Sequence, residues 1–296
     1  MSILKNQTLL GVLFAIGGFS SFAFGDVIIK YLRDYYTPYT IAFFTTLFCS
    51  VILVAFSSKL GGLRRSLASK KLKFHLFRGL LLAVEFILFI YGFAYLPMST
   101  AYALIFITPF VASLMAIPLL GERVKTKQWA AILLGFAGVL IVLRPGMVPL
   151  GLPVIATLIG ACFFAASNVM VRVIGEKDET VLSFALLAEL VICGVSFMLY
   201  LTAPELPTLN HMLLLVVVGI FSAIALLLLP MAFLRAPAAT ISPFHYIQML
   251  WGIIFGYIFF GDGVDVWVAL GSAVIIASGI WLIRQERGKV PDYGAL

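Results

Sequence analysis

The feature that most constrains the fold of this chain is a succession of apolar runs, each long enough to cross a bilayer as a helix. A transmembrane helix needs about 20 consecutive, mostly apolar residues. With 62% hydrophobic and only 11% charged residues, the 296-residue chain cannot cover a water-soluble surface. We therefore predict an all-α membrane protein with ten transmembrane helices. Short polar or Gly- and Pro-containing stretches separate the ten runs, which lie at residues 8–31, 38–57, 75–95, 98–120, 128–143, 151–174, 180–202, 210–234, 238–260 and 266–283.

The distribution of basic residues predicts which ends of these helices face the cytoplasm. If the N-terminus is cytoplasmic, 17 of the 20 Lys and Arg lie on that side, many of them in the loop "SSKLGGLRRSLASKKLKF". Lys30, Arg33 and Arg144 fall on the other side. Since cytoplasmic loops carry an excess of Lys and Arg, we expect both termini in the cytoplasm of a multi-pass protein of the cell inner (plasma) membrane. A short basic loop beside the membrane predicts anionic membrane lipids as partners, and not nucleic acid.

The two halves of the chain resemble each other when one is displaced by about 140 residues. Each half contains five runs, and because five is odd, the second half must enter the membrane from the opposite side. The charges agree, since basic "ERVKTK" follows the fourth run and acidic "DGVD" follows the ninth. Inverted repeats are typical of alternating-access transporters, so we predict five-helix repeats at 1–146 and 147–290 and a C-terminal tail at 291–296. The matched residues are Pro97 with Pro237, Thr100 with Thr240, Gly79 with Gly219, Gly121 with Gly261 and, displaced by 142, Asp26 with Asn168.

Several segments resemble a known family. "GERV" at the end of the fourth run and "QWAAILLGFAGVLIVLRPG" after it resemble the drug/metabolite transporter superfamily, EamA type. "GDVIIKYL", "RGLLLAVEFILFIYGFAYLP" and "ATISPFHYIQMLWGIIFGYIFFGD" are similar to the branch that contains bacterial S-adenosylmethionine carriers. The superfamily also contains amino-acid metabolite exporters. The resemblance covers essentially the whole chain and implies a ten-helix transporter of small metabolites, while it leaves the substrate open.

Glu85 is the most informative ionisable residue inside an apolar run. A charge there costs a few kcal/mol, and such residues tend to face a cavity. Glu85 lies seven residues past Arg78, about 10 Å into the third helix, and aligns with Ala225 in the second repeat. We expect Glu85 to bind a cationic or zwitterionic amine or to couple transport to protons; the alternative is a hydrogen bond to a neighbouring helix. Arg78 is expected to extend to the membrane interface.

Asp26 and Lys30 lie four residues apart on one face of the first helix, where they can pair. Lys30 is close enough to the end of the helix to reach lipid headgroups. Asp26 lies deeper, and its repeat partner Asn168 is also polar. We therefore name Asp26 and Asn168 as candidate lining residues, with structural pairing as the alternative for Asp26.

The fourth and ninth runs carry polar and aromatic residues on matching faces. Tyr102 and Phe106 share a face, and the displacement by 140 places Ser242 and Tyr246 over them, with His245 adjoining. These five residues are predicted to line a cavity between the repeats. An aromatic ring taken alone belongs more often to the packed core than to a binding site, whereas an imidazole is hard to explain by apolar packing.

Three further residues complete the predicted binding set, and one acid is left out of it. Gln248 and Trp251 lie on a neighbouring face of the ninth run, and Tyr91 shares a face with Tyr95 in the third. Glu189 lies in the middle of the seventh run, which the resemblance implies to be peripheral. We therefore expect Glu189 to bond to a neighbouring helix or to contribute to a dimer contact. A monomer and a homodimer both remain open.

The sequence lacks the motifs of several other function classes. No H-E-x-x-H or G-x-S-x-G motif occurs, so we predict no enzyme. The three cysteines, Cys49, Cys162 and Cys193, are scattered along the chain, so we predict no metal site and no cofactor. No G-x-x-x-x-G-K-[ST] motif for ATP binding occurs. The sequence predicts a secondary transporter whose small-molecule substrates are amino acids or their derivatives, with S-adenosylmethionine a candidate. A channel-like facilitator or a non-transporting scaffold or sensor is the alternative.

Overall fold

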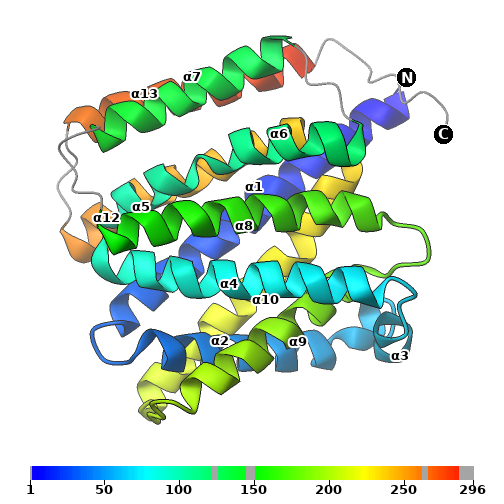
Figure 1. Cartoon of the computed structure of the whole chain (residues 1–296), viewed down its shortest axis with the longest axis vertical. Helices are drawn as coiled ribbons and strands as arrows, with labels where there is room; N and C mark the ends of the chain where they lie inside the picture. Colours follow the sequence, from blue (N-terminus) through cyan, green and yellow to red (C-terminus); the bar gives the residue numbers. More distant parts are fainter. Residues whose placement is uncertain (1, 122–125, 145–150, 262–265, 287–296) are drawn as a thin grey trace.

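The computed structural model describes residues 2–121, 126–144, 151–261 and 266–286. Within these ranges all regular secondary structure is helical (Figure 1). Eight helical segments are long and apolar enough to cross a membrane, while the apolar stretches Thr126–Ile141 and Ala269–Ser278 are shorter. The helices are α1 (Ser2–Leu32), α2 (Pro38–Ala55), α3 (Leu63–Leu67), α4 (Leu72–Tyr95), α5 (Met98–Ile105), α6 (Thr108–Leu120), α7 (Thr126–Leu143), α8 (Leu152–Ile174), α9 (Val181–Tyr200), α10 (Leu209–Arg235), α11 (Ala238–Ile241), α12 (Ile247–Phe260) and α13 (Val266–Glu286), with 3₁₀ turns η1 (Ser57–Lys59) and η2 (Ser242–Tyr246).

Two of the predicted runs are interrupted helices. The run 98–120 divides into α5 and α6, because Pro109 has no N–H to donate to the carbonyl of Ile105. The Thr108 hydroxyl donates to that carbonyl instead, at 2.5 Å. The run 238–260 divides into α11, η2 and α12, and Pro243 lies in the first turn of η2. Both interruptions bring irregular backbone into apolar segments, which is tolerated where the backbone is buried in protein or lines a cavity.

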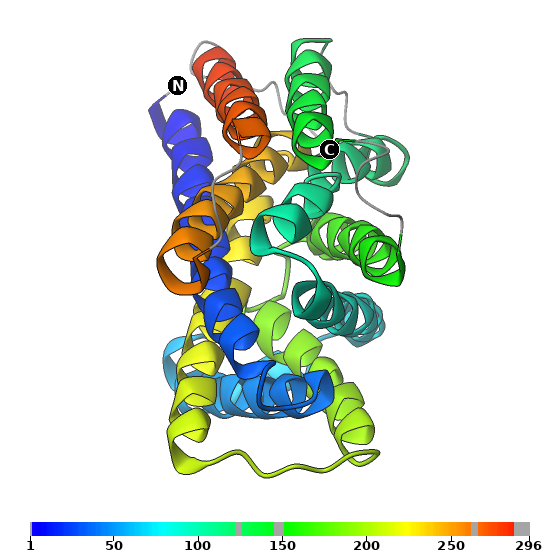
Figure 2. The same cartoon turned by 90° about the vertical axis from the view of Figure 1, so that its left-hand side faces the viewer.

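The helices pack as a set of close pairs. α1 lies along α10 and α8 lies along α4, while α2 contacts both α9 and α10, and α4 contacts α9. α7 and α13 pair at one edge of the molecule (Figures 1 and 2). The start of α1, α3, the α8–α9 turn and the end of α13 lie at one end, on the right in Figure 1, called here the α3 end. The α1–α2 and α9–α10 connections lie at the opposite end.

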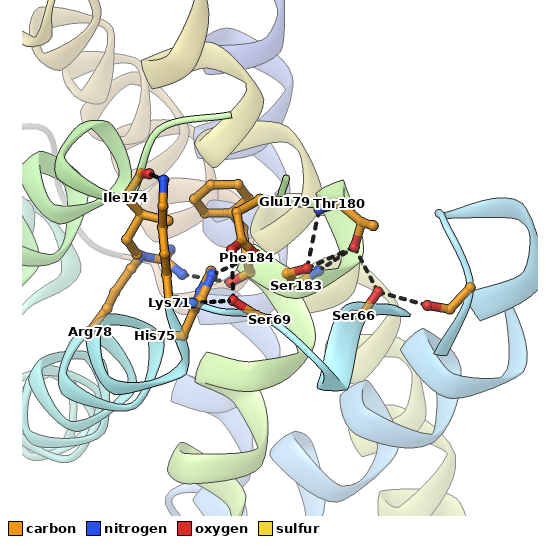
Figure 3. Close-up of polar contacts among 11 residues, drawn as sticks. Ser66, Ser69, Lys71, His75, Arg78, Ile174, Glu179, Thr180, Ser183 and Phe184 are labelled. Atoms are coloured by element: carbon orange, nitrogen blue, oxygen red, sulfur yellow. Dashed lines mark hydrogen bonds and ion pairs between the residues drawn. The ribbon is translucent and has the colours of Figure 1, made fainter. Parts of the chain in front are cut away.

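A buried polar cluster closes the α3 end by joining α3 and the start of α4 to the α8–α9 turn (Figure 3). The carboxyl group of Glu179 accepts a hydrogen bond from the Ser69 hydroxyl at 2.6 Å and lies 3.1 Å from Nε2 of His75. The Ser66 and Thr180 hydroxyls are 2.6 Å apart. These contacts join segments that lie more than a hundred residues apart in the sequence.

Arg78 belongs to the same region and corrects a prediction. Its side chain does not extend to the interface but is buried, with 2% of its surface exposed. The guanidinium donates to the carbonyls of Ser167 at 3.2 Å and Phe184 at 2.6 Å, so it joins α4 to α8 and α9. Lys71 donates in the same way to the carbonyl of Ile174. Buried donors of this kind are tolerated because the carbonyl oxygens satisfy them.

A second polar cluster joins the α1–α2 connection to the start of α10 at the opposite end. The Tyr36 hydroxyl lies 2.9 Å from Nδ1 of His211 and accepts a hydrogen bond from the backbone N–H of Thr208 at 3.0 Å. The backbone N–H of Thr37 donates to the Glu205 carboxyl at 3.2 Å. Polar contacts therefore hold both ends of the helical bundle together.

Candidate substrate cavity

A cavity of about 70 Å³ lies among the helices. Three carboxyl groups, those of Asp26, Glu85 and Glu189, lie on its wall together with His245 and Gln248. Within the described residues no Lys or Arg lines it. The remaining wall is mostly apolar and aromatic, formed by Phe22, Gly25, Ile29, Thr45, Thr46, Leu82, Phe86, Phe89, Ile90, Phe93, Ile105, Phe164, Ile192, Val218, Ser222 and Leu226.

Asp26 of α1 and Glu85 of α4 form an acidic pair on this wall. Their carboxyl groups are close enough for the charge of one to act on the other. The Tyr102 hydroxyl donates to Oδ2 of Asp26 at 2.8 Å, whereas Lys30 directs its ammonium to the ring of Phe260, 4.5 Å from the centroid. Asp26 is therefore joined to α5 by a hydrogen bond, and Lys30 contacts α12 through the ring of Phe260.

His245 lies on the wall from η2, between aromatic rings. Its imidazole stacks on Phe19 with 4.6 Å between centroids, and Phe164 lies at 5.1 Å on another side. Nδ1 of His245 and Oε1 of Gln248 have no hydrogen-bond partner within the described chain. Buried polar atoms are normally paired, so a ligand or water in the cavity is the natural partner for these two.

Several predicted residues lie behind the cavity wall. Tyr102 and Phe106 are fully buried, and Phe106 packs edge-on against Tyr246 at 5.0 Å. Ser242 and Asn168 are also buried, each with one polar atom that lacks a partner in the described part of the molecule. These five side chains are within the packed core around the cavity and are absent from its lining.

Trp251 and Tyr91 are the remaining members of the predicted set. The indole N–H of Trp251 donates to the Ser20 hydroxyl at 2.9 Å, and this ring stacks on Phe255. Tyr91 packs against Tyr95 with 4.9 Å between ring centroids. Neither residue lies on the cavity wall, so their predicted role in substrate binding has no geometric support here.

Glu189 lies on the cavity wall, although it was not among the predicted binding residues. It was expected to bond to a neighbouring helix or to contribute to a dimer contact; its carboxyl group does interact with Cys49 of α2, and the residue, 2% exposed, also lines the cavity from α9. Its Oε1 atom has no hydrogen-bond partner among the described residues. The sequence does indicate a role for Glu189, because an intramembrane carboxyl group is by default a functional candidate.

Comparisons with known proteins agree with this architecture. The EamA-like transporter family matches residues 9–144. The chain is 27% identical to the S-adenosylmethionine uptake transporter of Rickettsia bellii, over 88% of this chain and 89% of that protein. It is 26% identical to the riboflavin transporter of Vibrio cholerae, over 98% and 97%, and 29% identical to that of Rhizobium johnstonii, over 72% and 70%.

A solved crystal structure shares the fold, with a TM-score of 0.73 over 96% of this chain and 98% of the other at 18% identity. The transporter relatives and the apolar helices together describe a multi-pass membrane protein. Residues 9–144 thus match the EamA-like transporter family, and the resemblance of this chain to the drug/metabolite transporters of EamA type is confirmed.

Proposed function

We propose that this protein is a secondary transporter, and not an enzyme, that moves amino acids or amino-acid derivatives by alternating access. S-adenosylmethionine is a candidate because relatives bear that name. The observation that carries the proposal is the cavity among the helices, whose wall combines carboxyl groups with aromatic rings. A carboxylate attracts an ammonium or sulfonium group, and aromatic faces bind cations by cation–π interaction. Asp26, Glu85, His245 and Gln248 are the proposed substrate-binding residues from the predicted set.

Packing of the helices supports the proposed pair of inverted five-helix repeats. A displacement of 140 to 142 residues carries α1 onto α8, α2 onto α9, α4 onto α10 and α7 onto α13. It therefore carries the α1–α10 contact onto the α8–α4 contact, and the α2–α10 contact onto the α9–α4 contact. All four contacts occur. An arrangement of ten spans in two repeats, 1–146 and 147–290, accounts for this correspondence between helix contacts in the two halves.

Matched glycines and prolines support the same repeats. A Cβ atom added at Gly79 would lie 2.8 Å from the Val191 side chain, and one added at Gly219 would lie 2.8 Å from the Phe48 side chain. Both glycines therefore permit the same close helix approach, of α4 to α9 and of α10 to α2. Two other matched pairs have the same backbone conformation: Gly121 and Gly261 with φ of 64° and 65°, and Pro97 and Pro237 with ψ of 144° and 146°.

The size of the cavity supports a mechanism in which the site opens to accept its substrate. Sites for drug-sized ligands have volumes of about 300–1,000 Å³, whereas this cavity has about 70 Å³. Polar clusters hold both ends, through Glu179 at the α3 end and Tyr36 at the other. A metabolite therefore enters when one cluster separates, and it leaves when the other does.

The positions of the ends support the proposed orientation. The start of α1, the end of α13 and α3, which carries Arg64 and Arg65, lie at the same end of the bundle (Figure 1). A cytoplasmic location of this end places the basic loop where positive charge is favoured. We therefore propose that both termini face the cytoplasm of an inner (plasma) membrane protein.

Counterflow in proteoliposomes tests the proposed function. Purified protein is reconstituted, loaded with unlabelled compound and assayed for uptake of labelled S-adenosylmethionine, riboflavin and amino acids. Saturable counterflow of S-adenosylmethionine or of an amino acid supports the proposal, whereas counterflow of riboflavin alone would support a transporter and overturn the proposed substrate class. Flux that does not saturate would indicate a channel-like facilitator, and the absence of any flux or binding would indicate a scaffold or sensor.

A further inference from the structure

Glu189 lies apart from the acidic pair of the cavity. It belongs to α9, and its carboxyl group interacts with Cys49 of α2. The acid that acts on Glu85 is Asp26. The cavity wall therefore contains two acidic positions, one formed by Asp26 and Glu85 and the other by Glu189.

The distance between the two positions follows from the packing of α9 on α4. A Cβ atom added at Gly79 of α4 would lie 3.1 Å from Cα of Ala188 in α9. Glu189 is the next residue, so its backbone lies beside Gly79 when position is measured along the α4 axis. Glu85 is six residues further along α4. At 1.5 Å per residue this separates the two acidic positions by about 9 Å along the helix axis.

Glu189 also has an incomplete set of hydrogen bonds. Its Oε1 atom is buried without a partner in the described part of the chain, and so is the hydroxyl of Thr45, which lines the same cavity. A carboxyl group buried in this way is costly in its ionised form, so it either keeps its proton or is compensated by a positive group. No Lys or Arg among the described lining residues can compensate it, so a cation in the cavity is the partner that would allow it to ionise.

The surroundings of the two positions favour a cation over an anion or a neutral ligand. In their ionised form the three carboxyl groups would repel a ligand of net negative charge, because no positive side chain lies on the described wall. A cation would supply their counter-charge, whereas beside a neutral ligand they would keep their protons. Phe22, Phe86 and Phe164 add ring faces to the wall, and such faces bind ammonium and sulfonium groups.

We infer that Glu189 is a second cation-binding residue of this cavity, and that the cavity takes an organic substrate with two cationic centres. One centre contacts Asp26 and Glu85, and the other contacts Glu189. The inference rests on the proposed function, since it assigns a substrate class to the same cavity. It adds Glu189 to the binding site and requires two positive charges on the substrate, neither of which follows from the relatives' names.

Two matched ligand pairs test the charge requirement. S-adenosylmethionine carries a sulfonium and an ammonium group, whereas S-adenosylhomocysteine has a neutral thioether in place of the sulfonium. 1,5-Diaminopentane and 1-aminopentane differ in the same way. Binding is measured by thermal stabilisation of the purified full-length protein, and transport by counterflow, for the wild type, Glu189→Gln and the control Glu176→Gln. Glu176 is exposed in the α8–α9 turn.

The expected result is that the wild type binds the dicationic member of a pair at least tenfold more tightly. Glu189→Gln should remove this preference while it leaves the weaker binding of the monocationic member unchanged, which also shows that the variant is folded. Glu176→Gln should behave as the wild type does. An equal loss for both members, or no loss for either, would overturn the role of Glu189. Transport of neutral or anionic compounds only would overturn the inference and leave the transporter intact, whereas absence of any transport or binding would overturn both.

Discussion

The phenol of Tyr102 donates a hydrogen bond of 2.8 Å to Oδ2 of Asp26 and so joins α5 to α1 behind the cavity. A Cβ atom added at Gly252 would collide with the Tyr102 ring, so this ring also packs tightly on α12. Tyr102 was predicted to contact substrate. The structure places it one layer further out, where it holds a wall residue in position.

Replacement of Tyr102 by Phe should destabilise this arrangement without creating a cavity. The variant loses one hydrogen bond to a carboxyl group, worth about 1.5–3 kcal/mol when the partner is charged. We expect a lower melting temperature and weaker transport, measured by thermal unfolding and counterflow. Tyr95→Phe is the matched control, because Tyr95 is 66% exposed. Unchanged melting and transport in Tyr102→Phe would show that Asp26 does not need this bond.

Replacement of Glu85 by Gln should reduce transport and leave the fold intact. The amide has nearly the same shape but cannot provide a counter-charge for a cation or carry a proton. The loss of a charge-assisted contact is worth about 1.5–3 kcal/mol, which corresponds to roughly a tenfold to hundredfold loss of affinity. Counterflow across a pH series and thermal unfolding provide the measurement, with exposed Glu176→Gln as the control. Full activity of Glu85→Gln at every pH would remove Glu85 from the site.

Replacement of Gly219 by Ala should destabilise the protein. The added Cβ would lie 2.8 Å from Cβ of Phe48 and 2.9 Å from the backbone nitrogen of Cys49, and a backbone atom cannot easily move away. Overpacking of this kind costs about 1–3 kcal/mol. Gly194→Ala is the control, because its added Cβ meets nothing within 4 Å, and alanine is favoured over glycine in a helix by up to about 1 kcal/mol.

Thermal unfolding should therefore rank Gly219→Ala below the wild type and Gly194→Ala at or above it. Gly79→Ala should resemble Gly219→Ala, because a Cβ there would lie 2.8 Å from the Val191 side chain and 3.1 Å from the Ala188 backbone. Different behaviour of the two variants would weaken the proposed equivalence of the repeats.

Replacement of Glu179 by Ala should loosen the α3 end. The variant removes the acceptor for Ser69 and the partner of His75, whose ring is buried. A buried polar group left without its partner costs about 1–3 kcal/mol. We expect faster amide hydrogen exchange in α3 and in the α8–α9 turn, measured by mass spectrometry. Lys177→Ala in the same turn is the exposed control, and equal exchange in both variants would mean that Glu179 does not hold this end.

The sequence by itself determined which segments are helical and apolar, because the length of an apolar run decides whether a helix can cross a bilayer. Each of the ten predicted runs lies on a helical segment, although the exact number of spans stays a prediction. The sequence also placed Asp26, Glu85, His245 and Gln248 among the residues of interest, and all four lie on the cavity wall. A buried ionisable or amide group is conspicuous in an apolar run because it is costly there.

Only the tertiary structure decided which face of each helix turns inward. A helix that is apolar all round carries no stripe that distinguishes lipid from protein, so Tyr102 and Trp251 could not be separated from wall residues by spacing. Glu189 lies on the wall because α9 packs on α2 and α4, and Arg78 is buried because carbonyls of α8 and α9 accept its hydrogen bonds. These contacts join residues far apart along the chain, and local periodicity has no information about them.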